Sequence, residues 1–292
     1  MLAPDGQDAL RAAVEAASGS AVRRLAVASG GDVAASFRAV LDDGRTLFVK
    51  THPSPPPGFF TTEAAGLEWL REPGAVRVPA VVSVSDGSAT APAHLILEWI
   101  DVGRSRVATD AEFGRALAQL HGAGAPSFGR EDRSPTGSRG LPNDPRPTWS
   151  GFYATCRLIP LARIAHDTSA LPSEDVDALE RLAGRLDDHD DGEPPARLHG
   201  DLWAGNRIVD GHGHSGLIDP AAHGGHREFD LAMMRLFGGF SAECFRAYDE
   251  VHPLRDGWQE RVALHQIAPL VVHAIKFGGG YVRAASAAIA RY

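Results

Sequence analysis

The sequence predicts an α+β protein with two lobes: an N-terminal antiparallel β-sheet with one internal helix, and a mostly α-helical C-terminal lobe. Apolar or alternating runs of strand length, separated by turn residues, are confined to the first hundred residues. Helical periodicity prevails from about residue 110 onward. A length of 292 residues is enough for two compact cores. We therefore predict a boundary between residues 1–98 and residues 99–292.

The N-terminal lobe is expected to begin with a helix over residues 5–18, which Gly19 ends. A second helix is expected over residues 60–72, after a proline-rich loop. The segment Asp42-Asp43-Gly44 is typical of a hairpin turn between two strands. The five predicted strands share β-branched or aromatic composition and flanking turn residues, and they cover residues 22–28, 35–41, 46–50, 78–84 and 94–99.

The C-terminal lobe is predicted to be helical because its apolar residues recur every three or four positions. The expected helices cover residues 110–121, 149–165, 174–187, 228–250 and 258–290, with breaks in the last two. Pro269 is expected to kink the last of them. The segment Gly124–Pro147 is rich in glycine, proline and serine, and we expect a long loop there, near a functional cleft.

The net charge of −8 would repel a nucleic acid or an anionic membrane surface at long range, so neither partner is expected. No apolar run approaches the length of a membrane span, and the acidic residues near the N-terminus argue against a signal peptide. The two cysteines, Cys156 and Cys244, match no disulfide framework or metal-ligand spacing and are expected to be small core residues. These observations favour a cytoplasmic protein, and we expect it to be a monomer.

The segment His199–Asn206 has the layout of a phosphoryl-transfer catalytic loop. A polar loop lies between apolar segments, and a predicted hairpin follows that ends in Asp219. The chemistry needs one carboxylate to accept or orient the proton of the attacking hydroxyl, which suits Asp201. It also needs carbonyl and carboxylate ligands for magnesium, which suit Asn206 and Asp219. The five-residue spacing of Asp201 and Asn206 matches the catalytic loop of kinases, although an Asp and an Asn that cap turns would give the same short pattern.

Lys50 adds an independent part of this chemistry. The chain has only two lysines, and Lys50 ends a predicted strand in a sheet of the kind that carries a phosphate-binding lysine. Such a lysine requires a carboxylate on the next helix. Glu63 shares a helical face with the apolar Leu67, whereas Glu68 lies about 140° away, so we choose Glu63. The alternatives are a solvated cation at the strand end and a glutamate that stabilises the helix dipole.

Two further elements are candidates for nucleotide contacts. Gly30 and Gly31 lie in the first predicted hairpin and would let backbone amides approach phosphates, although paired glycines are usually only a turn. Glu98 and Ile100 lie where an apolar strand runs into the connection between the lobes. Their backbone groups are candidates to bind an adenine edge, and the alternative is the end of a core strand.

Two hydrolytic functions are weighed against this hypothesis. The first is a metal centre, for which the candidate ligands are His199, Asp201, His212, His214, His223 and His226. This scheme contains no H-E-x-x-H pattern and gives no role to Lys50, Glu63 or Asn206. The second is a serine hydrolase, for which no G-x-S-x-G segment is present.

On these motifs the sequence resembles the fructosamine kinase (ketosamine-3-kinase) family, a branch of the protein-kinase-like fold related to aminoglycoside phosphotransferases. The residues that carry the resemblance are His199–Asn206, Ile218–Ala221, Gly225–Met233, Leu236–Phe240 and Phe277–Tyr281, with weaker similarity over the rest of the chain.

The resemblance implies ATP-dependent phosphorylation of the 3-hydroxyl of a small-molecule or protein-bound ketosamine. It implies Asp201 as the base, Asn206 and Asp219 as Mg²⁺ ligands, and Lys50 with Glu63 as the phosphate-positioning pair. The resemblance also implies that His199 and Asp230 support the catalytic loop and that Trp203 stacks on the sugar. For Trp203, packing in the core is the alternative.

One departure from the family pattern and two alternative functions accompany this resemblance. Asp32 stands where some relatives have a redox-active cysteine, so no disulfide switch is expected. A kinase of aminoglycosides or other small hydroxyl compounds would share the same fold. A catalytically idle nucleotide-binding module is the alternative from another class.

Overall fold

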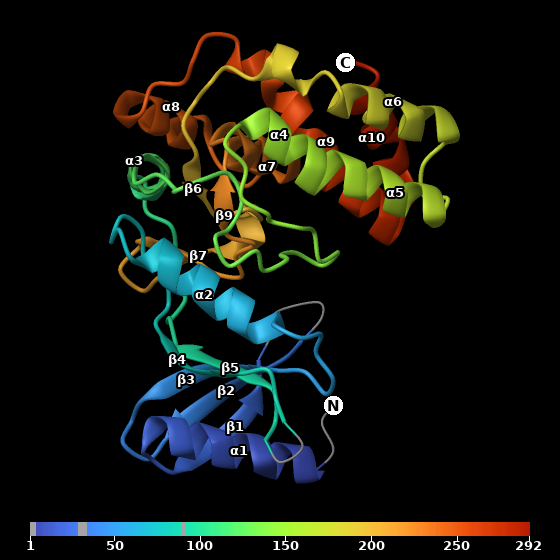
Figure 1. Cartoon of the computed structure of the whole chain (residues 1–292). Coiled ribbons are helices and arrows are strands. Elements are labelled where there is room, and N and C mark those ends of the chain that lie inside the picture. Colours follow the sequence, from blue (N-terminus) through green and yellow to red (C-terminus); the bar gives the residue numbers. More distant parts are fainter. Residues whose placement is uncertain (1–3, 29–33, 89–90) are drawn as a thin grey trace.

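The computed structural model describes residues 4–28, 34–88 and 91–292. A five-stranded sheet with a helix on either side forms one end of the molecule, and helices dominate the other end (Figure 1). The predicted α+β class, with its antiparallel sheet followed by helices, is confirmed. The division of the chain at residues 98 and 99 stays a prediction.

The sheet has the strand order β1-β2-β3-β5-β4, and each neighbouring pair is antiparallel. The fourth strand begins three residues later than predicted, at Val81. Pro79 explains the difference, because proline lacks an N–H group for the ladder and is disfavoured inside a strand. The strand bounds are β1 (Val22–Val27), β2 (Ala35–Leu41), β3 (Thr46–Thr51), β4 (Val81–Ser85) and β5 (His94–Glu98).

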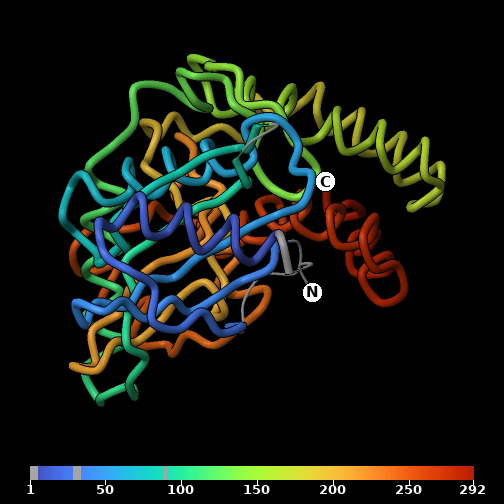
Figure 2. Tube along the Cα trace, turned by 90° about the horizontal axis from the view of Figure 1, so that it is seen from below, coloured from blue at the N-terminus to red at the C-terminus, as the bar shows by residue number. Residues whose placement is uncertain are grey.

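Two helices cover the sheet. Helix α1 (Pro4–Ser18) packs Leu10 and Val14 against one face, where both are fully buried with residues of β1, β2, β3 and β5. Figure 2 shows α1 lying across the strands in the view from below. Helix α2 (Phe59–Arg71) packs on the other side, and its buried Leu67 belongs to a core shared with β5 and with helices of the C-terminal part. This shared core fixes α2 between the sheet and the helical end of the chain.

The helical part is built around a second large core. The predicted helix over 149–165 is interrupted by a π-helical turn (Ala154–Leu158), and the helix predicted over 228–250 breaks at residues 238–241. Pro269 lies inside a continuous helix. The helix bounds are α3 (Thr109–Gly122), α4 (Trp149–Tyr153), α5 (Ile159–Asp167), α6 (Ser173–Ala183), α7 (Glu228–Phe237), α8 (Ala242–Val251), α9 (Trp258–Phe277) and α10 (Gly280–Ile289).

Two short antiparallel ribbons lie between the sheet and the helices. One pairs β6 (Ala196–Leu198) with β9 (His223–Gly225), and the other pairs β7 (Arg207–Val209) with β8 (Ser215–Leu217). The long loop after α3 joins the first ribbon through a bridge between Gly129 and Gly224. The loop predicted over 124–147 is therefore ordered by backbone hydrogen bonds to neighbouring segments.

Both cysteines are buried, as expected for core residues. Among the described residues, no helix combines the length and the apolar character that a membrane span requires.

Candidate active site

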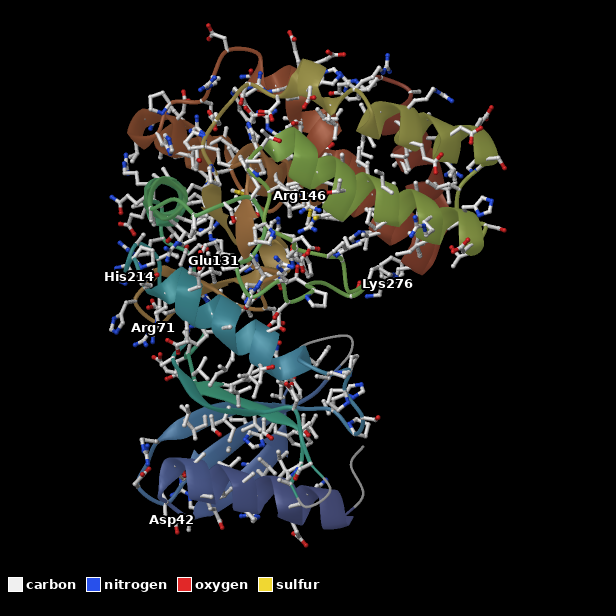
Figure 3. All side chains as sticks on the ribbon, viewed as in Figure 1. Asp42, Arg71, Glu131, Arg146, His214 and Lys276 are labelled. Carbon is white, nitrogen blue, oxygen red and sulfur yellow. The ribbon has the colours of Figure 1, made fainter. Side chains whose placement is uncertain are left out.

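The predicted site residues gather where the sheet and α2 meet the two ribbons. Lys50 extends from β3, and its Nζ lies 2.7 Å from Glu63 Oε1 on α2 and 2.6 Å from Asp219 Oδ1 after β8. Burial works against the charge on Lys50, but attraction by the two carboxylates outweighs it and raises the pKa of Lys50. The ammonium therefore stays charged. The other lysine, Lys276, lies in the last turn of α9 (Figure 3), with Nζ 4.9 Å from the ring centre of Phe277.

Asp219 differs from its two partners in exposure. Its side chain is 31% exposed, compared with 7% for Lys50 and 15% for Glu63. Of the two carboxylates that contact Lys50, that of Asp219 is therefore the more accessible to a ligand. Its backbone has a φ of 54°, a left-handed conformation that is uncommon for residues other than glycine. Strained conformations of this kind concentrate at functional sites, where surrounding contacts maintain them.

Asp201 and Asn206 are joined within one turn of the chain. The Asn206 amide donates from Nδ2 to the Asp201 carbonyl oxygen at 2.8 Å and to Asp201 Oδ2 at 3.1 Å. The same Nδ2 lies 3.4 Å from the Asp219 carbonyl oxygen. With Nδ2 committed to these contacts, the acceptor Oδ1 is the Asn206 atom suited to ligate a cation.

The Asp201 carboxyl group is set up as a base. Burial raises the pKa of Asp201, while His199 and the hydrogen bond from Asn206 act in the opposite direction. His273 on α9 also acts to lower the pKa of Asp201. A carboxylate with a raised pKa is a stronger proton acceptor than a solvated aspartate.

The catalytic loop is held from beneath by Asp230 on α7. Asp230 is fully buried, and its two oxygens accept the N–H groups of His199 at 2.8 Å and Gly200 at 2.9 Å. Burial opposes its ionisation, but His121, His199 and the Gly200 N–H together hold the pKa of Asp230 below its usual value. Gly200 has a φ of 79°, and a Cβ there would overlap the Ala221 carbonyl oxygen. The turn therefore requires glycine.

His199 connects this loop to the segment that carries Asp219. The His199 ring accepts the Asp201 N–H at Nδ1, so the proton is on Nε2, which donates to the Ile218 carbonyl oxygen at 2.9 Å. Its backbone oxygen accepts the Ala221 N–H at 3.0 Å. One buried imidazole thus fixes the relative position of two segments that are about twenty residues apart in the sequence.

Trp203 is exposed, with 43% of its surface accessible to solvent. This finding argues against the alternative that it is a core residue. Its indole ring folds over Gly205, where a Cβ would overlap the ring. A flat aromatic surface is therefore presented two residues after Asp201.

The nucleotide-contact candidates have different outcomes. Gly30 and Gly31 lie outside the described residues. The Glu98 N–H already donates to the Ala80 carbonyl oxygen at 2.9 Å, and its carboxylate pairs with Arg77 at 2.8 Å. Glu98 could therefore contact an adenine only through its carbonyl oxygen. Ile100 follows it and is buried.

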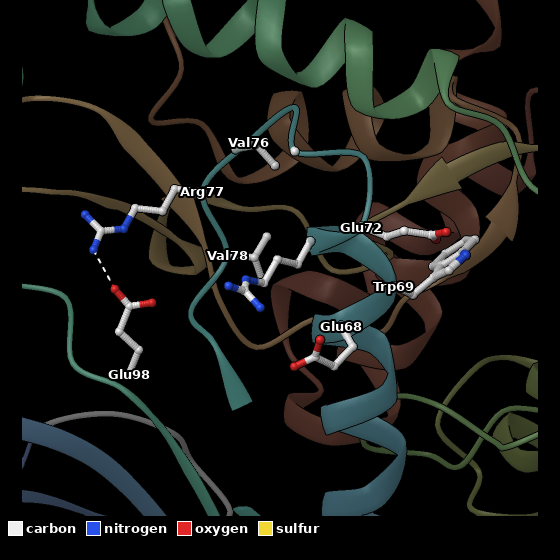
Figure 4. Close-up of a pocket in the computed structure, with 9 residues that line it drawn as sticks. Glu68, Trp69, Glu72, Val76, Arg77, Val78 and Glu98 are labelled. Atoms are coloured by element: carbon white, nitrogen blue, oxygen red, sulfur yellow. Dashed lines mark hydrogen bonds and ion pairs between the residues drawn. The ribbon is translucent and has the colours of Figure 1, made fainter. Parts of the chain in front are cut away.

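A pocket of about 860 Å³ lies beside α2 (Figure 4). Glu98 and Arg77 line it together with Glu68, Trp69 and Glu72, and none of the catalytic candidates does. Of the predicted site residues, Glu98 therefore lines this pocket, and Lys50, Glu63, Asp201, Asn206 and Asp219 do not.

His121 and His273 were missed by the sequence analysis. His121 Nε2 lies 3.3 Å from Asp230 Oδ2, and His121 Nδ1 lies 2.8 Å from the Tyr248 hydroxyl. His273 interacts with Asp201 and has its ring against Phe237, with ring centres 4.8 Å apart. No local pattern marks either residue, because both contacts join segments that are far apart in the sequence.

The histidines proposed as a rival hydrolytic centre do not gather. Within residues 4–28, 34–88 and 91–292, the group of three or more potential ligands consists of His226, Glu228 and His265. It shares only His226 with the predicted set. His212 and His214 lie in the turn between β7 and β8, with exposed side chains.

Comparison with known proteins points to one family. The model of the family described as "Fructosamine kinase" matches residues 8–292. A protein of Enterococcus faecium named "probable ketoamine kinase" is 35% identical over 256 residues, which cover 86% of this chain and 89% of that protein.

Solved structures agree with the sequence comparison. A candidate fructosamine-3-kinase from Thermobifida fusca is 40% identical, with a TM-score of 0.87 over 97% of each chain. A choline kinase from Streptococcus pneumoniae has a TM-score of 0.63 at 16% identity over 98% of this chain and 99% of that one. The second likeness shows the fold alone, a fold shared with small-molecule kinases.

Proposed function

This chain belongs to the fructosamine kinase family, and we propose that it transfers the γ-phosphoryl group of ATP to the 3-hydroxyl of a ketosamine. It is an ATP-dependent phosphotransferase. The observation that carries the proposal is the meeting of Lys50 with Glu63 and Asp219 beside the loop that holds Asp201 and Asn206. Phosphoryl transfer requires these groups, and no hydrolytic scheme uses all five.

At the phosphate end, Lys50 would bind phosphate oxygens of ATP while Glu63 holds its ammonium in place. Asn206 Oδ1 and the exposed carboxylate of Asp219 are oxygen donors, which are the ligands that Mg²⁺ prefers, so the residues fit this ion. Magnesium, when bound, neutralises charge on the transferred phosphoryl group. The fixed positions of Lys50 and Asp219 mean that little reorganisation is needed when the substrates meet.

At the acceptor end, Asp201 would accept the proton of the attacking sugar hydroxyl. Its raised pKa and its hydrogen bond from Asn206 support this role, because the carboxylate is oriented and basic at once. The exposed ring of Trp203 is a suitable surface for stacking on the sugar. Asp230 and His199 would act as positioning residues for the loop.

At the adenine end, we propose contacts from the Glu98 carbonyl and the Ile100 backbone. Residues 1–98 would then supply the nucleotide-binding lobe and residues 99–292 the catalytic loop and the substrate site. Phosphate contacts by Gly30 and Gly31 belong to the same proposal. The monomeric state and the cytoplasmic location stay predictions.

The test is ADP release with ATP and Mg²⁺ on a panel of ribuloselysine, erythruloselysine, fructoselysine and kanamycin. We expect turnover on at least one ketosamine, with product phosphorylated at the 3-hydroxyl by NMR, and loss of that turnover in Asp201→Asn. Turnover on kanamycin alone would instead assign the chain to the aminoglycoside kinases. ATP binding without turnover on any acceptor would contradict the proposed reaction and favour the non-catalytic alternative.

A further inference from the structure

A second cluster of chemically reactive side chains lies in the helical part of the molecule. His226 precedes α7, Glu228 is the first residue of α7, and His265 lies in α9. All three are buried, and one potential ligand atom of each lies within 4.8 Å of the others. Asp191 adjoins them, with Oδ1 3.1 Å from His226 Nε2. The proposed phosphoryl-transfer reaction uses none of these four residues.

His265 is the unusual member of this cluster. Its side chain is buried, and both ring nitrogens lack a hydrogen-bond partner among the described residues. Glu228 Oε2 lies 3.5 Å from His265 Nε2, which is too long for a good hydrogen bond. Buried polar atoms in native proteins are nearly always paired, and an exception often marks an ion or a water molecule. The imidazole lone pair is therefore available to a ligand.

The arrangement of the side chains also suits a cation. Metals bind the neutral form of imidazole, and His226 Nε2 and His265 Nε2 each face a carboxylate oxygen. His226 Nδ1 accepts the Glu228 N–H at 3.3 Å, which leaves Nε2 to carry a proton toward Asp191. A metal ion would displace that one proton.

Arg261 is the positive group against which a metal ion must compete. It binds Glu228 from Nε at 2.9 Å and from Nη2 at 2.5 Å, and its Nη2 lies 3.3 Å from Asp191 Oδ2. Asp191 Oδ1, the oxygen that faces His226, is not the oxygen that faces Arg261. Glu228 Oε2, the oxygen that faces His265, also accepts Arg261 Nε at 2.9 Å, so an ion would share this oxygen with the guanidinium. The two carboxylates together supply two negative charges against the one positive charge of Arg261.

We propose that His226, Glu228 and His265, with Asp191 as a fourth ligand, bind one divalent transition-metal ion of the zinc class. Histidine nitrogens and carboxylate oxygens are both ligands of Zn²⁺, which is usually bound in tetrahedral geometry. With metal–ligand bonds of about 2.0 to 2.1 Å, ligand atoms in a tetrahedron lie roughly 3.3 Å apart. The pairs His226–Asp191 at 3.1 Å and His265–Glu228 at 3.5 Å already approach that spacing.

The expected role of this ion is structural. It would join the segment before β6 to the start of α7 and to α9, three segments far apart in the sequence. Asp230, which holds the catalytic loop, lies only two residues after Glu228 on α7. An ion at this place would therefore stabilise the support of the loop without contacting the reacting groups.

The test measures metal content and thermal stability of the full-length, tag-free protein. The protein is produced in medium with added zinc, washed with EDTA in the presence of Mg²⁺ and ADP, and analysed by mass spectrometry of its metals. We expect about one zinc per chain, and a Tm that falls when a stronger chelator removes the ion at elevated temperature. Replacement by Co²⁺ should give the intense visible absorption of a four-coordinate site. Wild-type protein without retained zinc and without that cobalt spectrum would overturn the proposal.

Two variants locate the ion. His265→Phe removes one ligand but keeps an aromatic ring beside Trp149, whose ring centre lies 5.0 Å from that of His265. We expect it to lose the zinc and the cobalt absorption. His214→Gln removes an exposed histidine in the turn between β7 and β8 and should retain both. Equal zinc content in the two variants would overturn the assignment, and the wild-type cobalt spectrum decides the question if His265→Phe does not fold.

Discussion

Lys50 Nζ and Asp219 Oδ1 lie 2.6 Å apart, although 169 positions separate the two residues in the sequence. The contact joins β3 of the sheet to the end of the β7–β8 ribbon, so it fixes the two sides of the proposed phosphate site relative to each other. Because Glu63 holds the same ammonium at 2.7 Å, Lys50 is shared between two carboxylates.

We predict that Asp219→Asn abolishes most phosphoryl transfer while the protein stays folded. The amide keeps the shape of the side chain but removes the charge that pairs with Lys50 and that a magnesium ion requires. Loss of one electrostatic stabiliser typically lowers kcat by about 10²–10³-fold, and the loss here should be at least that large. ADP release on the active ketosamine measures it. Asp43→Asn, at an exposed turn, is the matched control, and equal activity of the two variants would contradict the role of Asp219.

A pH profile tests Asp201. The ionised carboxylate is the form that accepts a proton, so kcat/KM for the ketosamine should fall as the pH falls through the pKa of Asp201. Because burial raises that pKa, the acid limb should lie at a higher pH than for an ordinary aspartate. Lys50 stays charged throughout, since its pKa is raised, and it contributes no limb near neutral pH.

The control for this profile is Asp201→Asn. Its residual rate still changes with pH through the titration of ATP, but no longer through that of residue 201. Comparison of the two pH profiles therefore isolates the acid limb that the Asp201 carboxylate causes. The same acid limb in Asp201→Asn and in the wild-type protein would show that another group is responsible.

Local patterns in the sequence were sufficient for most of the fold. Strand and helix periodicity located the five strands of the sheet, and the turn residues at Asp42–Gly44 marked the hairpin between β2 and β3. The hairpin predicted to end in Asp219 is the β7–β8 ribbon. Helical periodicity also distinguished Glu63, which lies 2.7 Å from Lys50, from Glu68, which accepts the Val81 N–H at 3.4 Å. Each of these inferences uses residues within about two helical turns of one another.

Contacts between distant segments could not be inferred in this way. The support of Asp230 by His121, and the cluster around His265, depend on how α3, α7 and α9 pack, which periodicity does not determine. The late start of β4, by contrast, follows from a local feature, Pro79, which the predicted strand bounds did not take into account. The exposure of Trp203 depends on the position of its ring over Gly205, which secondary-structure propensities do not predict.

Trp203 can be displaced without being removed. A Cβ at residue 205 would overlap its indole ring, so Gly205→Ala should push the ring from its position. We predict a rise in KM for the ketosamine of about tenfold, equivalent to roughly 1.4 kcal/mol, with little change in KM for ATP. Gly211→Ala, where no atom lies within 4 Å of the added methyl group, is the control and should behave as wild type. Equal KM values for the ketosamine in both variants would argue against stacking by Trp203.

Two glycines of α3 provide a matched test of the helical packing. A Cβ on Gly114 would overlap the Cys244 carbonyl oxygen of α8, a backbone atom that cannot move aside by itself. A Cβ on Gly122 would meet only His252 Nδ1, at 3.8 Å, an ordinary contact. Overpacking costs about 1–3 kcal/mol, whereas alanine in place of glycine favours a helix by up to about 1 kcal/mol.

We therefore expect Gly114→Ala to lower the free energy of unfolding by about 1–3 kcal/mol and Gly122→Ala to leave it unchanged or raise it slightly. Urea unfolding followed by circular dichroism measures both variants against the wild-type protein. Helix propensity predicts the same sign for the two substitutions, and only the close approach of α3 to α8 predicts opposite signs. Stabilisation by both substitutions would mean that the two helices lie farther apart than the structure has them.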